Sequence, residues 1–148
     1  MPAFSHPTSL SSQQVKFVDD FYKVSDKPDA VDEYLSFLTS DVTFIMGLNG
    51  VEGSAAVRKI RENMWNGVKS RHHKPEILLA SEDGKTFMLH GTVDYGLRNG
   101  TSVNSVGWAG KMEFAEGSEL KLKRYQVWLD GALLSNALKE QAAEESEH

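Results

Sequence analysis

The chain has 148 residues, enough for one domain with a single buried core, and its 40% hydrophobic and 25% charged residues are typical of a soluble globular protein. A net charge of -5 disfavours nucleic acid or an anionic membrane surface as a partner, and the lack of cysteine excludes disulfides and thiol chemistry. Apolar runs stay well short of the roughly 18 residues that a membrane helix needs, and MPAFSHPTSL at the start does not have the pattern of a signal peptide, so we expect a cytoplasmic protein.

Helix patterns begin after a short lead-in. Residues 1–10 contain two prolines and no apolar period, which predicts a flexible segment. Ser11 followed by Gln14 fits a capping box, and apolar residues then recur at helical spacing as far as Ser25, so a first helix is expected there. A second helix pattern starts after Asp26. Its apolar stripe is Val31, Tyr34, Leu35 and Leu38.

A short strand and a third helix follow. Val42–Met46 is an apolar run of strand length, and three glycines then mark a loop before Ser54, which we expect to cap the helix. The predicted buried stripe of this helix is Val57, Ile60, Met64, Trp65 and Val68. The opposite face is predicted to be a solvated helix face without a functional role. It carries Arg58, Lys59, Arg61 and Glu62.

From Arg71 the apolar period changes to two, which is typical of a strand. His73 has the parity of two apolar residues further along and is predicted to point inward, whereas His72 points outward. The two apolar residues are Ile77 and Leu79. Because adjacent strand residues face opposite sides, the two histidines cannot bind one ion, and no metal site is predicted.

The stretch Lys85–Asp130 contains three long strand patterns with internal glycines, which predicts a curved sheet around a pocket. Asn99-Gly100 marks the first hairpin. The predicted inward face of the first strand is Phe87, Leu89, Gly91, Val93, Tyr95 and Leu97, and that of the second is Asn104, Val106, Trp108, Gly110, Met112 and Phe114. The third strand changes parity, which a bulge near Lys123 would reconcile.

The order helix, helix, short strand, helix and four antiparallel strands resembles the nuclear-transport-factor-two-like (NTF2-like) superfamily, from Ser11 to Asp130. It is most similar to the SnoaL-like branch, and its SRHH segment and closing YQVWLD look like those of a group of small fungal proteins. The resemblance implies an α+β cone, with a strongly curved antiparallel sheet wrapped around three N-terminal helices. We expect a single domain over residues 11–131 and a C-terminal tail over 132–148, helical at first and then acidic and frayed.

The resemblance also suggests roles for single residues. Tyr22 falls where ketosteroid isomerases have an oxyanion-binding tyrosine, but Met46 and Gly110 stand at the positions of that family's two aspartates, which disfavours steroid isomerisation. His73 matches a cavity histidine of scytalone dehydratase, although the second histidine of that family has no clear match. Asn104 corresponds loosely to a cavity asparagine of the same family.

Two carboxylates are left open. Asp94 lies on the outer face of its strand with His90 and would become a cavity base only if the facing of that strand were reversed. Asp130 ends the last strand as a cap or turn residue, and its place in the closing motif keeps a functional role open. The epoxide hydrolase pattern is not reproduced, since Val127 stands near the position of its second aspartate.

These observations predict an enzyme of the isomerase, dehydratase or polyketide cyclase type, active in secondary metabolism on a hydrophobic, carbonyl-bearing small molecule without metal or other cofactor. His73 would move the proton, and Tyr22, Tyr95 and Asn104 would hold the oxygen. The expected apolar lining is Trp65, Trp108, Met64, Met112, Phe21 and Met46. The alternative is a non-catalytic ligand-binding or scaffold protein of the same fold. In either case we expect a homodimer formed through the convex face of the sheet.

Overall fold

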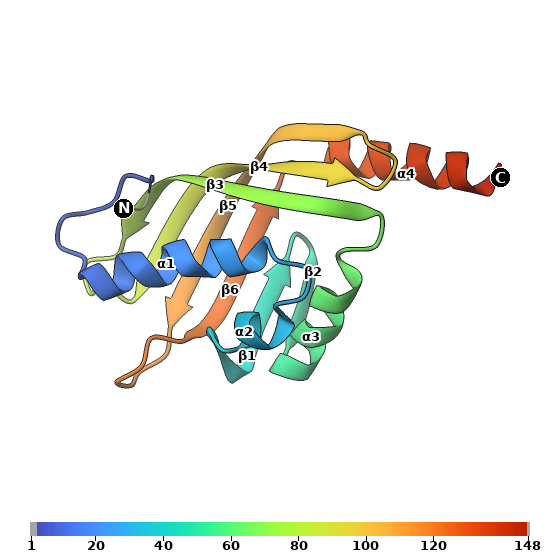
Figure 1. Cartoon of the computed structure of the whole chain (residues 1–148). Helices are drawn as coiled ribbons and strands as arrows, with labels where there is room; N and C mark the ends of the chain where they lie inside the picture. The colour runs from blue at the N-terminus through green and yellow to red at the C-terminus, as the bar shows by residue number, and fades with distance from the viewer. Residues whose placement is uncertain (1–2, 148) are drawn as a thin grey trace.

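The computed structural model describes residues 3–147, in which a six-stranded sheet curves around the first helix (Figure 1). The elements are α1 (Ser12–Ser25), α2 (Val31–Leu35), β1 (Leu38–Met46), β2 (Asn49–Glu52), α3 (Ser54–Asn63), β3 (Val68–Ala80), β4 (Thr86–Leu97), β5 (Ser102–Phe114), β6 (Leu122–Leu129) and α4 (Ala132–Ser146). The predicted α+β cone is confirmed. Among the helices of this described part, none is both long and apolar enough to cross a membrane.

The sheet has the strand order β2-β1-β6-β5-β4-β3 and does not close into a barrel. Its pairings are antiparallel except that of β1 with β6, which is parallel. The helix α1 lies across the concave face, with α2 and α3 beside β1 at one end of the sheet (Figure 1). This arrangement leaves the core between α1 and the sheet.

The start of α1 follows the predicted capping box. The Ser11 hydroxyl accepts the Gln14 N–H at 3.1 Å, and the Gln14 side chain accepts the Ser11 N–H at 2.9 Å, so two N–H groups at the helix start have partners. The helix buries Val18, Phe21 and Tyr22 almost completely against the sheet. Burial of this face anchors α1 in the cone.

The segment after α2 differs from the prediction. Leu38, expected on a helix, begins β1 and pairs with Leu122, because pairing with a distant strand outweighs the local helical spacing. The predicted glycine loop contains the short strand β2, which pairs with β1. Gly53, with φ 90°, takes the N-cap position of α3, and Ser54 is the first helical residue.

Two bulges change which side chains face inward. In β3 the register shifts between Pro75 and Ile77, so Leu78 is buried, and the predicted inward facing of Ile77 and Leu79 is wrong. Pro75 has no N–H for the ladder, which accounts for the irregularity. In β6 the predicted bulge is confirmed, since the register with β5 shifts between Glu113 and Phe114, opposite Lys123.

The bulge in β5 moves a predicted site residue. Val93 pairs with Val106 but Tyr95 pairs with Val103, and Ser105 lies at φ 57°, a value that few residues other than glycine adopt. Val103 therefore takes the inward place, and the prediction that Asn104 faces the cavity is wrong because its side chain is exposed.

Both chain ends contact the sheet. In the predicted lead-in, Phe4 is buried, and the backbone of Ser5 bonds to the edge strand β3 through Glu76 and Leu78 at 2.9 and 2.8 Å. At the other end, α4 continues helically through the acidic segment that was expected to fray. The buried Gln141 of α4 donates to the Gly67 carbonyl at 2.9 Å, which fixes the helix to the start of β3.

Candidate active site

A cavity of about 130 Å³ lies between the helices and the concave face of the sheet. All four helices or their caps and every strand except β2 contribute to its wall, which is mostly aromatic and aliphatic. The lining residues are Ser25, Tyr34, Phe44, Met46, Arg61, Met64, Arg71, His73, Tyr95, Trp108, Tyr125, Val127, Leu129 and Leu134.

The structure brings together part of the predicted site. His73, Tyr95, Trp108, Met64 and Met46 line the cavity. Five other predicted residues are not in its wall, among them the exposed Asn104. Tyr22 lies behind the wall, and Trp65 stacks on Arg71. Phe21 and Met112 belong to the hydrophobic core, with 1% and 0% of their surface exposed.

The carboxylate of Asp26 holds the His73 side chain. Nδ1 of His73 lies 2.5 Å from Oδ1 of Asp26, and the same carboxylate accepts the backbone N–H of His73 at 3.0 Å. Because an ionised carboxylate can only accept a hydrogen bond, Nδ1 of His73 is the donor, and in the neutral form of the imidazole the free electron pair lies on Nε2. Since His73 also lines the cavity, Nε2 is the nitrogen left for a ligand.

Aromatic rings fix the position of the imidazole. The ring centroid of His73 lies 5.4 Å from that of Tyr22 and 5.8 Å from that of Trp108. The Trp108 indole N–H donates in turn to the Thr92 carbonyl at 2.9 Å. With 17% of its side chain exposed, His73 is held on several sides yet still reachable.

Tyr22 and Tyr125 form a buried hydroxyl pair, with their oxygens 3.0 Å apart. Burial, more than the neighbouring phenols, raises the pKa of Tyr22 well above its usual value. Burial also raises the pKa of Tyr125 to about 12. Both groups therefore stay neutral at physiological pH, and Tyr125 rather than Tyr22 presents its side chain to the cavity.

Two arginines reach the cavity from α3 and β3. Arg61 is 2% exposed, donates to the Ser25 carbonyl at 2.8 Å and lies 4.2 Å from the centre of the Tyr34 ring. Arg71 donates to the Met64 carbonyl and stacks on Trp65 at 4.7 Å. Burial lowers the pKa of Arg61, and it lowers the pKa of Arg71 to about 10. Because a guanidinium keeps its proton in proteins at neutral pH, both side chains are cations there.

Tyr95 lies beside Arg71, whose guanidinium is 5.6 Å from the centre of its ring. Burial raises the pKa of the Tyr95 phenol, although the nearby Arg71 cation acts in the opposite direction. A neutral phenol on the cavity wall is a hydrogen-bond donor to an oxygen that becomes negative.

A second depression, of about 550 Å³, shares His73 with the cavity. Tyr22, Asp26 and His73 line it together with the exposed His72 and Lys74. His73 is therefore the residue common to the walls of both pockets.

Sequence reasoning missed Asp26, Arg61 and Arg71. The prediction that Arg61 lies on a solvated face is wrong, because position 61 follows the buried Val57 by four residues and shares its helix face. Arg71 has the strand parity of His73, which also indicated an inward side chain. Asp26 follows Tyr22 by four residues, but its contact with β3 is not visible in any local pattern.

The two carboxylates whose role the sequence left undecided, Asp94 and Asp130, lie outside the site. Asp94 bonds to Lys74 at 2.8 Å and accepts the Ser105 N–H at 2.7 Å, so it supports the bulge on the outer face. Asp130 is exposed at the end of β6. Among residues 3–147 no group of three or more His, Cys, Asp or Glu side chains is placed to hold a metal ion.

Comparisons with known proteins identify the fold. A scan of the sequence against protein-family models found no match, and a search of curated proteins also found none. Solved structures do match. An NTF2-like protein of unknown function from Burkholderia pseudomallei is 16% identical, with a TM-score of 0.71 over 84% of this chain and 95% of its own. A protein from Jannaschia sp. CCS1, named after the SnoaL-like polyketide cyclases, is 14% identical, with a TM-score of 0.71 over 89% and 95%.

A third structure carries a reaction in its name. The epoxide hydrolase/cyclase-like enzyme SalBIII, described for pyran ring formation in the polyether salinomycin, is 18% identical. Its TM-score is 0.65 over 79% of this chain and 90% of its own. The chain therefore has the NTF2-like fold. Within that fold its neighbours include SnoaL-like proteins, as the sequence resemblance predicted.

Proposed function

We propose that the protein is a cofactor-independent enzyme that moves a proton on a hydrophobic, carbonyl-bearing small molecule, as isomerases, dehydratases and cyclases do. The observation that carries this proposal is His73 on the wall of a mostly apolar cavity, with its ring bonded to the Asp26 carboxylate. A carboxylate that fixes the imidazole tautomer leaves a basic nitrogen facing the ligand, and this is the usual support of a general base.

The proposed reaction begins with Nε2 of His73 taking a proton from the carbon next to the carbonyl. The electrons of the broken C–H bond form a C=C bond to the carbonyl carbon, and the π electrons of the C=O bond move onto the oxygen. The Tyr95 hydroxyl stabilises the resulting enolate oxygen by donating a hydrogen bond. Asp26 stabilises the imidazolium. Return of the proton to another carbon gives isomerisation, and its transfer to a departing hydroxyl releases water and gives dehydration. In a cyclisation, the enolate carbon attacks a second carbonyl and the proton goes to the new alkoxide.

The neighbours support a reaction of this type. One is named after polyketide cyclases and another is a cyclase-like enzyme of ring formation, so the cone is a fold on which small-molecule ring chemistry occurs. A place in secondary metabolism is part of the proposal on the same ground.

Deuterium exchange tests the proposal without knowledge of the natural substrate. Small cyclic ketones and keto acids are incubated with the protein in heavy water, and deuterium uptake next to the carbonyl is followed by NMR. We expect the wild type to accelerate uptake for at least one compound of the panel. Uptake that never exceeds the rate with buffer alone would contradict the proposed proton transfer.

We also propose that the protein is a homodimer that packs through the convex face of its sheet. That face carries an apolar stripe, in which Leu79 lies opposite Met88, and Ile77 and Trp128 are joined through His90 and Ala109. Leu79, Trp128, Met88 and Ile77 are 58%, 42%, 41% and 40% exposed. Exposed apolar side chains gathered on one face of a sheet, here interrupted by His90, are typical of an interaction face.

A further inference from the structure

The two arginines of the cavity differ from every other arginine of the chain. Arg58, Arg98 and Arg124 each pair with a carboxylate, at 2.6, 2.8 and 3.2 Å. Within residues 3–147, neither Arg61 nor Arg71 forms an ion pair. The arginines at the surface thus have counter-ions, whereas the two that line the cavity do not.

Burial makes this arrangement costly. A buried guanidinium normally has a carboxylate partner, because removal of a charge from water is unfavourable unless the charge is paired and hydrogen-bonded. Asp26 is the carboxylate whose charge raises the pKa of both arginines. Its oxygens, however, are bonded to His73. Nε of Arg61 and Nη1 of Arg71 are buried without an acceptor in the described part of the chain.

The two guanidinium groups also converge. Nη1 of Arg61 lies 2.8 Å from the sulfur of Met64, and Nη2 of Arg71 donates to the carbonyl oxygen of the same residue. Their like charges repel, and this adds to burial in lowering the pKa of Arg71. An anion between them would replace this repulsion by two attractions.

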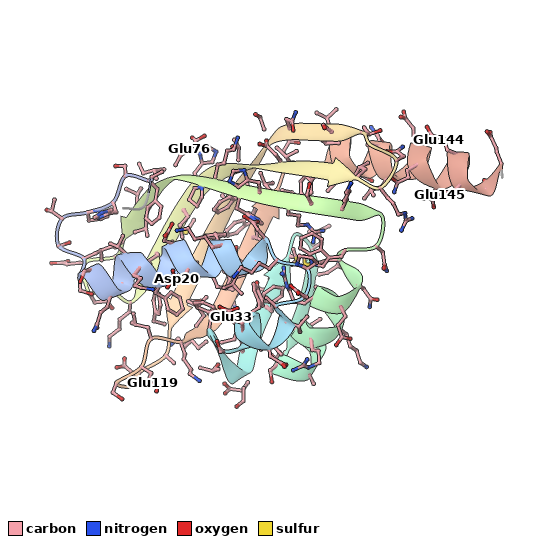
Figure 2. All side chains as sticks on the ribbon, in the orientation of Figure 1. Asp20, Glu33, Glu76, Glu119, Glu144 and Glu145 are labelled. Atoms are coloured by element: carbon pink, nitrogen blue, oxygen red, sulfur yellow. The ribbon has the colours of Figure 1, made fainter. Side chains whose placement is uncertain are left out.

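The distribution of acidic residues makes the contrast sharper. Although the net charge of the chain is -5, the labelled carboxylates Glu76, Glu119, Glu144 and Glu145 lie at the periphery of the molecule (Figure 2). Each of these four residues is exposed. The lining of the cavity, by contrast, contains two arginines and no carboxylate.

We propose that the cavity binds its ligand as a carboxylate, held between Arg61 and Arg71, with a single apolar ring packed against Trp108. The planar guanidinium fork matches the two oxygens of a carboxylate, and this is the geometry in which arginine binds best. The volume of about 130 Å³ is somewhat below that of a cavity of about 150 Å³ that binds benzene, so it limits the ligand to one small ring. The substrate class is then a small aromatic or alicyclic keto acid, a conclusion that rests on the proposed function for the carbonyl but not for the acid.

Benzoate and benzamide form the test pair, because they have the same shape and differ in charge. Their affinities for the full chain are measured by calorimetry and by backbone NMR shifts. We expect saturable benzoate binding in the cavity and benzamide binding at least about tenfold weaker. Equal affinities, or no saturable binding of benzoate, would overturn the proposal, and this comparison needs no variant to fold.

Variants of Arg71 then test whether this residue causes the preference for benzoate over benzamide. Arg71→Gln is expected to abolish the preference for benzoate over benzamide, and Arg71→Lys to retain part of it. The control is Arg58→Gln, on the same helix as Arg61 but paired with Asp32 at the surface, and it should bind benzoate as the wild type does. An unchanged preference in Arg71→Gln would overturn the role of that residue.

The outcome separates this inference from the proposed function. His73→Gln should still bind benzoate while deuterium exchange is lost. If benzoate binds selectively but no compound undergoes exchange, the protein is an acid-binding module of the same fold. If exchange depends on His73 but benzoate is not preferred, the carboxylate inference is wrong and the proposed function stands.

Discussion

The Asp26 carboxylate binds His73 twice, at its backbone N–H and at Nδ1 of its ring, although the two residues are 47 positions apart. The end of α1 is thereby joined to β3 at the histidine that lines the cavity. This contact fixes the side-chain tautomer, so Asp26 acts as a positioning residue for His73.

Asp26→Asn tests the positioning role. An asparagine keeps the shape but can donate to Nδ1, which moves the imidazole proton to Nε2 and removes the base from the cavity. We expect the exchange rate to fall by about 10²- to 10⁴-fold. The imidazole nitrogen shifts, read by NMR, should report the change of tautomer. Asp19→Asn on the same helix, where Asp19 pairs with Lys23 at 2.7 Å, is the matched control and should retain activity.

The Tyr22–Tyr125 pair predicts a coupling in stability. Tyr22→Phe leaves the buried Tyr125 hydroxyl without its partner and should lower the free energy of unfolding by about 1–3 kcal/mol. Tyr125→Phe should cost a similar amount, and the double variant less than the sum of the two. Urea denaturation of the four proteins measures this coupling, and strict additivity would show that the hydroxyls do not interact.

All four tyrosines have pKa values raised mainly by burial. In the folded state they stay neutral above pH 10, whereas in the unfolded chain they ionise near pH 10. The folded state then binds more protons, so stability falls as pH rises past 10, by about 1.4 kcal/mol per pH unit for each tyrosine that is still neutral. Arg61 and Arg71 act in the opposite direction, because burial lowers the pKa of both, that of Arg71 to about 10, but they are two groups against four.

Tyrosinate absorbance gives the measurement for this alkaline effect. The native protein should show little ionisation near pH 10, and the protein in concentrated urea should show all four groups titrating there. Four native tyrosines titrating near pH 10 would mean that these phenols are not buried as described.

If the apolar stripe on the convex face is a dimer interface, a carboxylate introduced at either end of it should weaken the dimer. Leu79→Asp or Trp128→Asp should convert the dimer to a monomer, since an unpaired carboxylate in an interface is costly to bury. Sedimentation velocity measures the change, and Lys85→Asp, in the turn before β4, is a control that should remain dimeric. A wild type that sediments as a monomer at high concentration would refute the proposed dimer.

The sequence predicted the regular parts of the molecule and missed the contacts between distant segments. Strict alternation over β4 placed Val93 and Tyr95 inward, as observed, because a long half-buried strand has one consistent pattern. The same rule failed at Asn104, where a single bulge reverses the facing of the side chains. Local spacing cannot contain the pairing of Leu38 with Leu122 or the bond from Asp26 to His73.

Asp26, Arg61 and Arg71 were not identified as site residues from the sequence pattern for a physical reason. The sequence pattern of charged residues on a helix normally marks solvent, and Arg61 breaks that rule because aromatic and sulfur contacts stabilise it inside. His73 was found through the family resemblance. The parity with Ile77 and Leu79 that also placed it inward does not hold, because the bulge after Pro75 changes the facing between them. The residues that support it became visible only when α1, α3 and β3 were assembled.

The comparison of His73→Gln with His72→Gln tests the central proposal most directly. The two histidines are adjacent in β3, but His73 lines the cavity and His72 is exposed on the other face. For a ketone that the wild type exchanges, we expect His73→Gln to lower the rate of deuterium uptake at least about 100-fold and His72→Gln to change it less than about twofold. Equal rates for the two variants would contradict the assignment of His73 as the base.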